Sequence, residues 1–210
     1  MTNQKMVEHW DNIYATKQPS EVSWTQENPK TSLDFIRSFN LPKQASIIDV
    51  GGGDSRLVDK LLDEGFEDIT VLDISEEALK KAKARLGEKG KKINWVVADI
   101  TKYNTEKTFD LWHDRAVFHF MTTNDQISEY LDRARKNIKA NGVLTIGTFS
   151  ENGPKKCSGL EIKQYSEVTL QEQLMTGFKK MKCITEDHRT PFDTLQNFLF
   201  CSFRSQPNEG

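Results

Sequence analysis

The chain has 210 residues, of which 36% are hydrophobic and 29% are charged, and its formal net charge is -2. This length suits one domain with a substantial core, and the charge gives no general attraction to nucleic acid or to an anionic membrane. No apolar run approaches the roughly 18 to 20 residues needed to span a bilayer. The polar N-terminus also lacks the apolar stretch of a signal peptide. We therefore expect a cytoplasmic protein that binds neither nucleic acid nor membrane.

The chain opens with a segment rich in aromatic residues, which we assign to a cap over residues 1–40. Trp10, Tyr14 and Trp24 are interspersed with prolines in this segment. Residues 8–39 are therefore expected to pack as irregular structure and short helices.

From residue 46 onward, strand-like and helix-like segments alternate. Apolar and β-branched runs predict buried strands at 46–50, 68–72, 94–98, 109–113 and 142–147. Apolar residues at helical spacing predict helices that begin near 57 and 76 and a third over about 125–138, and Ser75 is suited to cap the second. This alternation implies parallel strands joined by right-handed crossovers.

The last third of the chain changes character. The polar residues 150–164 contain Gly-Pro and Ser-Gly pairs and predict a surface loop. A helix over 169–175 precedes two strand-like runs at 181–186 and 197–203, which we expect to form an antiparallel hairpin at the edge of the sheet. The interpretation is one α/β domain over 1–210, with a core at 41–204 and a flexible tail at 205–210.

Three cysteines, Cys157, Cys183 and Cys201, are widely spaced and form no C-x-x-C motif. An odd number at this spacing favours free thiols over a disulfide framework or a zinc site. The histidines and acids show no metal-ligand spacing either, so we expect no bound metal.

Acids lie at or near the ends of three predicted strands, where ligands of doubly wound sheets bind. Asp49 precedes the glycines 51–53, Asp73 follows the second strand, and Asp99 follows the third. An acid about 20 residues past the glycines suits ribose hydroxyls, while Asp99 and the amide of Ile100 suit an exocyclic amine and its neighbouring ring nitrogen. The pattern predicts a site for an adenosine-containing molecule.

The glycine segment helps to choose between adenosine cofactors. A dinucleotide fingerprint requires a third glycine where Arg56 stands. Asp54 would also place negative charge near a pyrophosphate at the helix N-terminus. An acidic loop tolerates the sulfonium and ammonium groups of S-adenosylmethionine, so we favour that cofactor over NAD.

Five ordered motifs resemble those of class I S-adenosylmethionine-dependent methyltransferases. They are residues 48–53 (IDVGGG), 71–75 (VLDIS), 97–100 (VADI), 109–111 (FDL) and 138–143 (IKANGV). The likeness runs from about residue 10 to the end and implies a Rossmann-like, doubly wound sheet of seven strands, mostly parallel with a C-terminal antiparallel hairpin. Residues 10–14 (WDNIY) and 23–26 (SWTQ) resemble a bacterial branch of small-molecule type.

The resemblance implies a cofactor site whose residues can be named. It assigns Gly51 and Gly53 to the methionine part, Asp73 with Ile74 to the ribose, Asp99 and Ile100 to the adenine, and backbone around Asp114 to the ammonium, with Asp49, Tyr14 and Trp24 completing the site. It also implies in-line transfer of the methyl group to an O, S or N atom of a small molecule, with S-adenosylhomocysteine as product.

Residues near the end of the fourth strand are candidates for the acceptor side. His119 is our candidate for a general base, and Arg115, His119 and Phe149 are expected to contact the substrate. Arg115 either binds an anionic substrate or ties its loop to an acid, and His113 is interpreted as structural. We expect the pocket and its lid to be formed by residues 118–120, Phe149 and residues 150–164.

Several alternatives stay open. No Asn/Asp-Pro-Pro-Tyr/Phe tetrapeptide follows the fourth strand, which by resemblance counts against amino methylation of bases or protein amides, but not against lysine methylation of proteins. An NAD-dependent oxidoreductase and a non-catalytic cofactor-binding module are the other two readings. The protein is expected to be a monomer or a homodimer.

Overall fold

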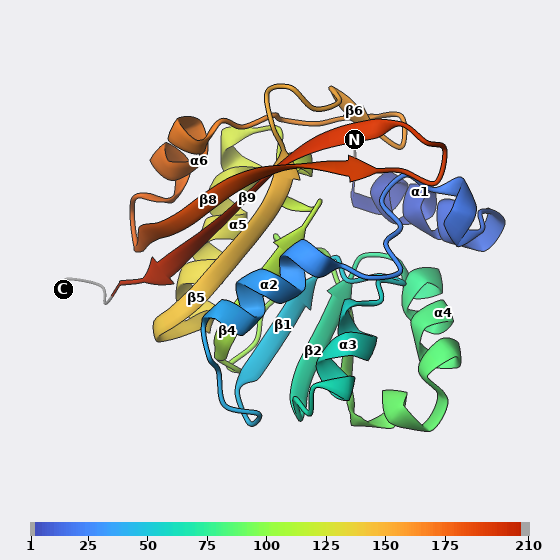
Figure 1. The fold of residues 1–210 in the computed structure, drawn as a ribbon, viewed down its shortest axis with the longest axis horizontal. Coiled ribbons are helices and arrows are strands. Elements are labelled where there is room, and N and C mark those ends of the chain that lie inside the picture. Colours follow the sequence, from blue (N-terminus) through green and yellow to red (C-terminus); the bar gives the residue numbers. More distant parts are fainter. Residues whose placement is uncertain (1–2, 207–210) are drawn as a thin grey trace.

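The computed structural model describes residues 3–206, and its centre is a twisted sheet with helices on both faces (Figure 1). The sheet has seven strands in the order β3-β2-β1-β4-β5-β9-β8. The parallel strands are β1 (Ser46–Val50), β2 (Asp68–Asp73), β3 (Asn94–Val97), β4 (Phe109–Arg115) and β5 (Ile138–Phe149). β9 (Leu195–Ser205) runs antiparallel to β5 and to β8 (Phe178–Arg189). The predicted fold is confirmed, including the C-terminal hairpin.

Helices cover the two faces of the sheet in separate groups. α2 (Lys30–Ser38), α3 (Leu57–Asp63) and α4 (Glu76–Leu86) pack on one face through residues such as Leu33, Leu61 and Leu79. α5 (Asn124–Asn137) and α6 (Glu167–Leu174) cover the other face through Ile127 and Leu170. Because both faces are covered, all five residues of β1 are buried, as parallel strands in such sheets usually are.

Local signals in the sequence set where helices begin. Ser75 caps α4 by accepting a hydrogen bond from the amide of Ala78 at 3.1 Å, and two glutamates occupy the first turn, as predicted. Thr123 forms a capping box with Gln126 at the start of α5. Three short 3-10 helices, η1 (Pro19–Glu21), η2 (Gly87–Lys92) and η3 (Phe118–Phe120), complete the helical elements of residues 3–206.

The N-terminal segment is more regular than expected. α1 (Asn3–Thr16) is a helix of 14 residues, so the expectation of irregular structure and short helices was wrong for this part. None of its residues is fully buried, because the helix lies across the ends of the strands instead of packing into the core. It is held there by Asp11, whose carboxylate accepts from the Ser75 hydroxyl at 2.6 Å and from the Glu77 amide at 3.2 Å.

Two further expectations about the last third need correction. The predicted loop 150–164 contains a small hairpin of β6 (Lys156–Cys157) and β7 (Leu160–Glu161), which turns Cys157 into the interior. Ser205, assigned to the tail, ends β9 opposite Phe178. Residues 207–210 of that tail lie outside the described residues.

The cysteines also differ from the prediction. Cys183 and Cys201 face each other on β8 and β9 and are joined by a disulfide, so only Cys157 is free. The prediction of free thiols was wrong for this pair. Whether the two cysteines meet depends on the pairing register of β8 and β9, which spacing along the chain does not reveal. None of the helices within residues 3–206 has the length and apolar character required to cross a membrane.

Candidate functional site

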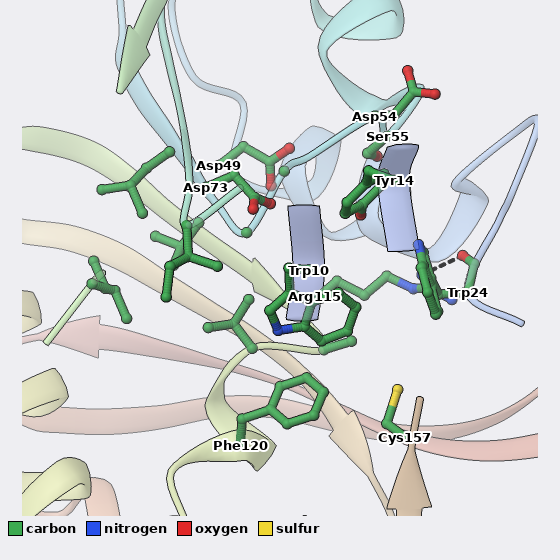
Figure 2. Close-up of a pocket in the computed structure, with 18 of the residues that line it drawn as sticks. Trp10, Tyr14, Trp24, Asp49, Asp54, Ser55, Asp73, Arg115, Phe120 and Cys157 are labelled. Atoms are coloured by element: carbon green, nitrogen blue, oxygen red, sulfur yellow. Dashed lines mark hydrogen bonds between the residues drawn. The ribbon is translucent and has the colours of Figure 1, made fainter. Parts of the chain in front are cut away.

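A cavity of about 380 Å³ opens at the carboxyl ends of the central strands and is lined by residues of α1 and of the segment that leads to α2 (Figure 2). This is the edge of the sheet at which strand order reverses, between β1 and β4. The predicted cofactor residues that line it are Tyr14, Trp24, Asp49, Gly51, Asp73, Ile74, Asp99 and Ile100. The two remaining ones, Gly53 and Asp114, lie behind its wall.

Asp73 ends β2 and is held by local backbone contacts. Its carboxylate accepts a hydrogen bond from the amide of Ser75 at 2.8 Å, and the amide of Gly53 also donates to it. Burial, with the nearby charges of Asp49 and Asp11, raises the pKa of Asp73 to about 7. The carboxylate is therefore fixed in place before any ligand arrives.

Asp99 follows β3 and uses the same kind of local contact. One carboxylate oxygen accepts from both the amide and the hydroxyl of Thr101, each at 2.8 Å. The other accepts from the side-chain amide of Asn3, which reaches over from α1. Asp73 and Asp99 thus face one cavity from neighbouring strands.

Asp49 belongs to a buried chain of hydrogen bonds at the base of the cavity. One of its oxygens lies 2.7 Å from Nδ1 of His113, and Nε2 of His113 lies 2.8 Å from the Ser32 hydroxyl on α2. Both ring nitrogens of His113 are therefore engaged, as a structural histidine requires. The second oxygen of Asp49 is buried and has no hydrogen-bond partner among the described residues.

The glycine loop is tightly enclosed. Gly51 and Gly53 have φ values of +65° and +46°, in the left-handed region that favours glycine. A Cβ atom on Gly51 would lie 1.9 Å from Cγ2 of Val117, and one on Gly53 would lie 2.7 Å from the hydroxyl of Tyr14. The loop therefore lies against the turn after β4 on one side and against α1 on the other.

The charge of this loop differs from the expectation. Asp54 is paired with Arg85, which also holds Asp59 with two hydrogen bonds, at 3.1 and 2.8 Å. The loop is therefore not a free acidic surface, and the argument that Asp54 repels a pyrophosphate was wrong. Arg56, in the position of the third glycine, lies 3.7 Å from Glu27.

Asp114 positions the turn after β4 instead of lining the cavity. One oxygen accepts from the amides of Val117 at 2.9 Å and Phe118 at 3.3 Å, and the other accepts from the hydroxyl of Tyr130 at 2.7 Å. Burial raises the pKa of Asp114 to about 6. The predicted contact between a ligand ammonium and the backbone here stays a prediction.

Arg115 extends from the end of β4 toward Trp24 (Figure 2). Its Nη1 donates to the carbonyl of Trp24 at 2.9 Å, and its Cζ lies 4.8 Å from the ring centroid of Phe198. No acid among the described residues lies within ion-pair distance of it, so the interpretation that it ties its loop to an acid was wrong. Burial lowers the pKa of the guanidinium to about 10.

His119 and Phe149 lie behind the cavity wall. They stack with ring centroids 4.7 Å apart, and their exposed fractions are 0% and 1%. Neither ring nitrogen of His119 has a partner among the described residues. Burial, with the charge of Arg115, lowers the pKa of His119 to about 3. Their roles as base and as substrate contacts stay predictions.

Trp10 and Ser32 were not among the predicted site residues, whereas Phe120 and Cys157 fall in the segments expected to form the pocket and its lid. Trp10 packs edge-on against Trp24 and Phe120, at centroid distances of 5.6 and 5.5 Å. Cys157 lines the same end of the cavity (Figure 2), and burial raises the pKa of its thiol to about 11. Trp10 stands in the WDNIY motif, which was a usable signal, whereas no sequence pattern indicates Ser32.

Comparison with known proteins relates part of the chain to a family. The model of the methyltransferase domain family matches residues 47–142, which include the glycine loop, Asp73, Asp99 and Arg115, and the seven-stranded sheet has the matching topology. Residues 47–142 of the chain are therefore similar to a methyltransferase domain. Within residues 3–206, no three His, Cys, Asp or Glu side chains are arranged to hold a metal ion.

Relatives of this chain act on different acceptors. N-terminal Xaa-Pro-Lys N-methyltransferase 1 of Rattus norvegicus is 30% identical over 124 residues, 55% of each chain. EEF1A lysine methyltransferase 2 of Danio rerio is 27% identical over 154 residues, 66% of each chain. The chain thus spans little more than half the length of the first of these relatives.

A solved structure shares the fold across nearly the whole chain. It is 1,6-didemethyltoxoflavin-N1-methyltransferase of Burkholderia thailandensis, with bound 1,6-didemethyltoxoflavin and S-adenosylhomocysteine. The TM-score is 0.69 at 19% sequence identity, and the match covers 98% of this chain and 87% of the other. At this identity the likeness concerns the fold alone.

Proposed function

We propose that the protein is an S-adenosylmethionine-dependent methyltransferase that transfers the methyl group directly to a small-molecule acceptor. One observation carries the proposal: Asp73 ends β2, Asp99 follows the neighbouring strand β3, and both face a single cavity beside the glycine loop. Their spacing along the sheet suits a ribose at Asp73 and an adenine at Asp99.

The residues of the cavity fit this cofactor in three places. Asp99 already accepts from the amide nitrogen of Asn3, a donor of the same kind as the exocyclic amine of adenine. The second oxygen of Asp49 is buried without a partner, so it can accept a hydrogen bond from a donor group of the ligand. Gly51 leaves no room for a side chain beside Val117, so backbone alone lines this part of the cavity.

The protein contributes to the reaction by aligning the reacting groups and by excluding water from the cavity. When bound, S-adenosylmethionine supplies a methyl group made electrophilic by the positive charge on sulfur. α1 and the segment carrying Trp24 cover the cavity, and Asp114 fixes the turn that separates the glycine loop from Arg115. Such enclosure and alignment favour an in-line displacement.

The imidazole at the cavity is not free to act as a base, because His113 uses both ring nitrogens. The proposed reaction therefore suits an acceptor that is already nucleophilic at working pH, such as a free amine or a thiolate. The aromatic walls formed by Trp10, Trp24 and Phe120 suit a small body with an apolar surface.

The cofactor assignment is tested by calorimetry with S-adenosylmethionine, S-adenosylhomocysteine and NAD. We expect micromolar binding of the two sulfur compounds and none of NAD. Asp73→Ala should weaken binding about a hundredfold because it removes a charged acceptor. Asp68→Ala is the matched control: Asp68 begins the same strand and pairs with Lys107 at 2.5 Å, outside the cavity. Tight NAD binding without the sulfur compounds would indicate a dehydrogenase instead.

A protein acceptor is the second candidate, favoured by the curated relatives that methylate protein N-termini and lysines. The protein is incubated with cell lysate and methyl-labelled cofactor, and the lysate is then separated by size. Label in the small-molecule fraction supports our proposal, whereas label on lysines or protein N-termini supports the alternative. Cofactor binding with no labelled product would indicate a non-catalytic binding module.

A further inference from the structure

The guanidinium of Arg115 has one hydrogen-bonding edge that the protein leaves unused. Nη1 is engaged by the Trp24 carbonyl, but Nε and Nη2 are buried and have no partner among the described residues. Leaving two buried donor atoms of a cation without hydrogen bonds costs folding free energy. Such an arrangement is expected where a ligand completes the set of hydrogen bonds.

Two other arginines in the molecule show what this edge binds. Nε and Nη2 of Arg37 both donate to Glu64, at 3.0 and 2.6 Å. The same two atoms of Arg85 hold the two oxygens of Asp59, at 3.1 and 2.8 Å. Arg37 uses this edge on one oxygen of Glu64 and Arg85 uses it on both oxygens of Asp59, so the planar pair of donors matches a carboxylate. Arg115 presents the same edge without an acid.

The acids and the thiol near Arg115 do not form an ion pair with it. Glu186 is hydrogen-bonded to the Thr31 hydroxyl, and Asp49 is engaged by His113. The Cys157 thiol stays protonated at neutral pH, because burial raises its pKa to about 11. The positive charge of Arg115 is therefore not neutralised by an ion pair within the described chain.

From this free edge, on a side chain that contacts the Trp24 carbonyl and the Phe198 ring, we propose that Arg115 binds a carboxylate of the methyl acceptor. The acceptor class is a small carboxylic acid with an aromatic or apolar body. This body would pack against the aromatic rings near Arg115. This inference rests on the proposed function and adds the chemical class of its substrate.

The methionine end of the cofactor also carries a carboxylate, so the test must separate two sources. 5′-Methylthioadenosine lacks the amino-acid part of S-adenosylhomocysteine. If the edge binds the acceptor, Arg115→Met should leave the affinities for both compounds within about threefold of wild type. Selective loss of S-adenosylhomocysteine binding, with methylthioadenosine binding retained, would overturn the proposal in favour of the cofactor's carboxylate.

The acceptor arm uses calorimetry on protein saturated with S-adenosylhomocysteine. The probes are benzoate, phenylacetate and indole-3-acetate, each beside its primary amide. We expect at least one carboxylate to bind about ten- to a hundredfold more tightly than its amide, because the amide loses the charge-assisted pair. Failure of every carboxylate to exceed its amide in wild-type protein would overturn the proposal without reliance on any variant.

Variants then assign the preference to this side chain. Arg115→Met should abolish it, and Arg115→Lys should retain only part, because an ammonium lacks the two-point edge. Arg37→Met removes the same charge at a site outside the cavity and should leave the preference intact. An unchanged preference in a folded Arg115→Met protein would contradict the proposal. Failure of S-adenosylhomocysteine to bind wild type would instead contradict the proposed function itself.

Discussion

The cavity has two halves that differ in how their polar groups are satisfied. In the cofactor half, Asp73 and Asp99 each accept a hydrogen bond from the backbone amide two residues further along. In the acceptor half, around Arg115 and the wall behind it, Arg115, His119 and Tyr165 keep buried polar atoms without partners among the described residues. Asp73 and Asp99 are therefore held by the protein itself, although one oxygen of the nearby Asp49 has no partner, whereas the acceptor half contains several groups that a ligand could complete.

This difference has a structural origin. In the cofactor half, Asp73 and Asp99 are held by short-range contacts next to strand ends. The acceptor half joins segments far apart in the chain, such as Arg115 with Trp24 and with Phe198. Rigidity is thus expected in the first half and adjustment to the ligand in the second.

The largest effect that would test the rigidity of the cofactor half is expected at Gly51. Gly51→Ala forces a side chain into the left-handed region and against Val117, so the free energy of unfolding should fall by about 2 to 5 kcal/mol. Denaturant titration measures the change.

A matched variant separates backbone strain from the steric clash. Gly65 has φ +87°, but a Cβ there meets nothing within 4 Å, so Gly65→Ala should cost only about 1 to 2 kcal/mol. Adding Val117→Ala to Gly51→Ala should recover part of the loss, because it removes the clashing methyl group. Equal costs at Gly51 and Gly65 would show that the loop is looser than the structure indicates.

A pair of buried tyrosines tests the comparison directly. The hydroxyl of Tyr130 donates to Asp114 at 2.7 Å and accepts from Trp112 at 3.0 Å, whereas the hydroxyl of Tyr165 has no partner among the described residues. Tyr130→Phe should cost about 2 to 3 kcal/mol of unfolding free energy, because it leaves two buried groups unsatisfied. Tyr165→Phe should be neutral or stabilising. Both ring environments are fully buried, so equal costs would remove the proposed distinction.

The two halves also differ in how far the sequence predicts them. Asp73 and Asp99 could be assigned to the cofactor site because their positions at strand ends, and the glycines before them, are visible as local patterns in the sequence. The parallel sheet and the terminal hairpin followed from the same periodicity. Asp114 shows the limit of this reasoning, since its position is right but its side chain holds a turn instead of lining the cavity.

The acceptor half could not be predicted in the same way. The placement of Cys157 depends on the β6–β7 hairpin, and the packing of Trp10 against Phe120 depends on where α1 lies. The pairing of Asp54 with Arg85 similarly joins a loop to a distant helix. Such contacts follow from tertiary packing, for which a single sequence contains no local signal.

A smaller effect concerns the titration of Asp73. Its pKa is about 7 in the folded protein against an ordinary value of 3.8, so folding favours the protonated form. The stabilisation associated with that proton is full below the unfolded value and is lost as the pH rises through about 7. The unfolding free energy of Asp73→Asn, relative to wild type, should therefore increase between pH 5 and pH 8.

Cofactor binding should show the complementary dependence. The ionised carboxylate is the better acceptor for ribose hydroxyls, so affinity for S-adenosylhomocysteine should rise about tenfold from pH 6 to pH 8 as Asp73 ionises. Asp73→Asn should bind weakly with no such dependence. Calorimetry at several pH values measures both, and a pH-independent affinity in wild type would place the ribose elsewhere.

The smallest effect is expected at Cys157, which sharpens the comparison from the acceptor side. A thiol with a pKa near 11 holds about a hundredfold less thiolate at neutral pH than one with an ordinary value near 9. Cys157→Ala should therefore leave cofactor binding and turnover within about twofold of wild type. Direct methyl transfer needs no covalent intermediate with the enzyme, so an inert thiol is compatible with the proposed reaction.

Maleimide labelling followed by intact-mass analysis checks the state of this thiol. Native protein should react slowly, and unfolding without reductant should expose Cys157 alone, because Cys183 and Cys201 are joined. Rapid labelling of Cys157 in the native protein would show that the acceptor half is open to solvent. Loss of turnover in Cys157→Ala, with cofactor binding intact, would make the thiol a participant in the reaction. Slow labelling with full turnover would leave Arg115 as the acceptor-half group whose unpartnered atoms still need a ligand.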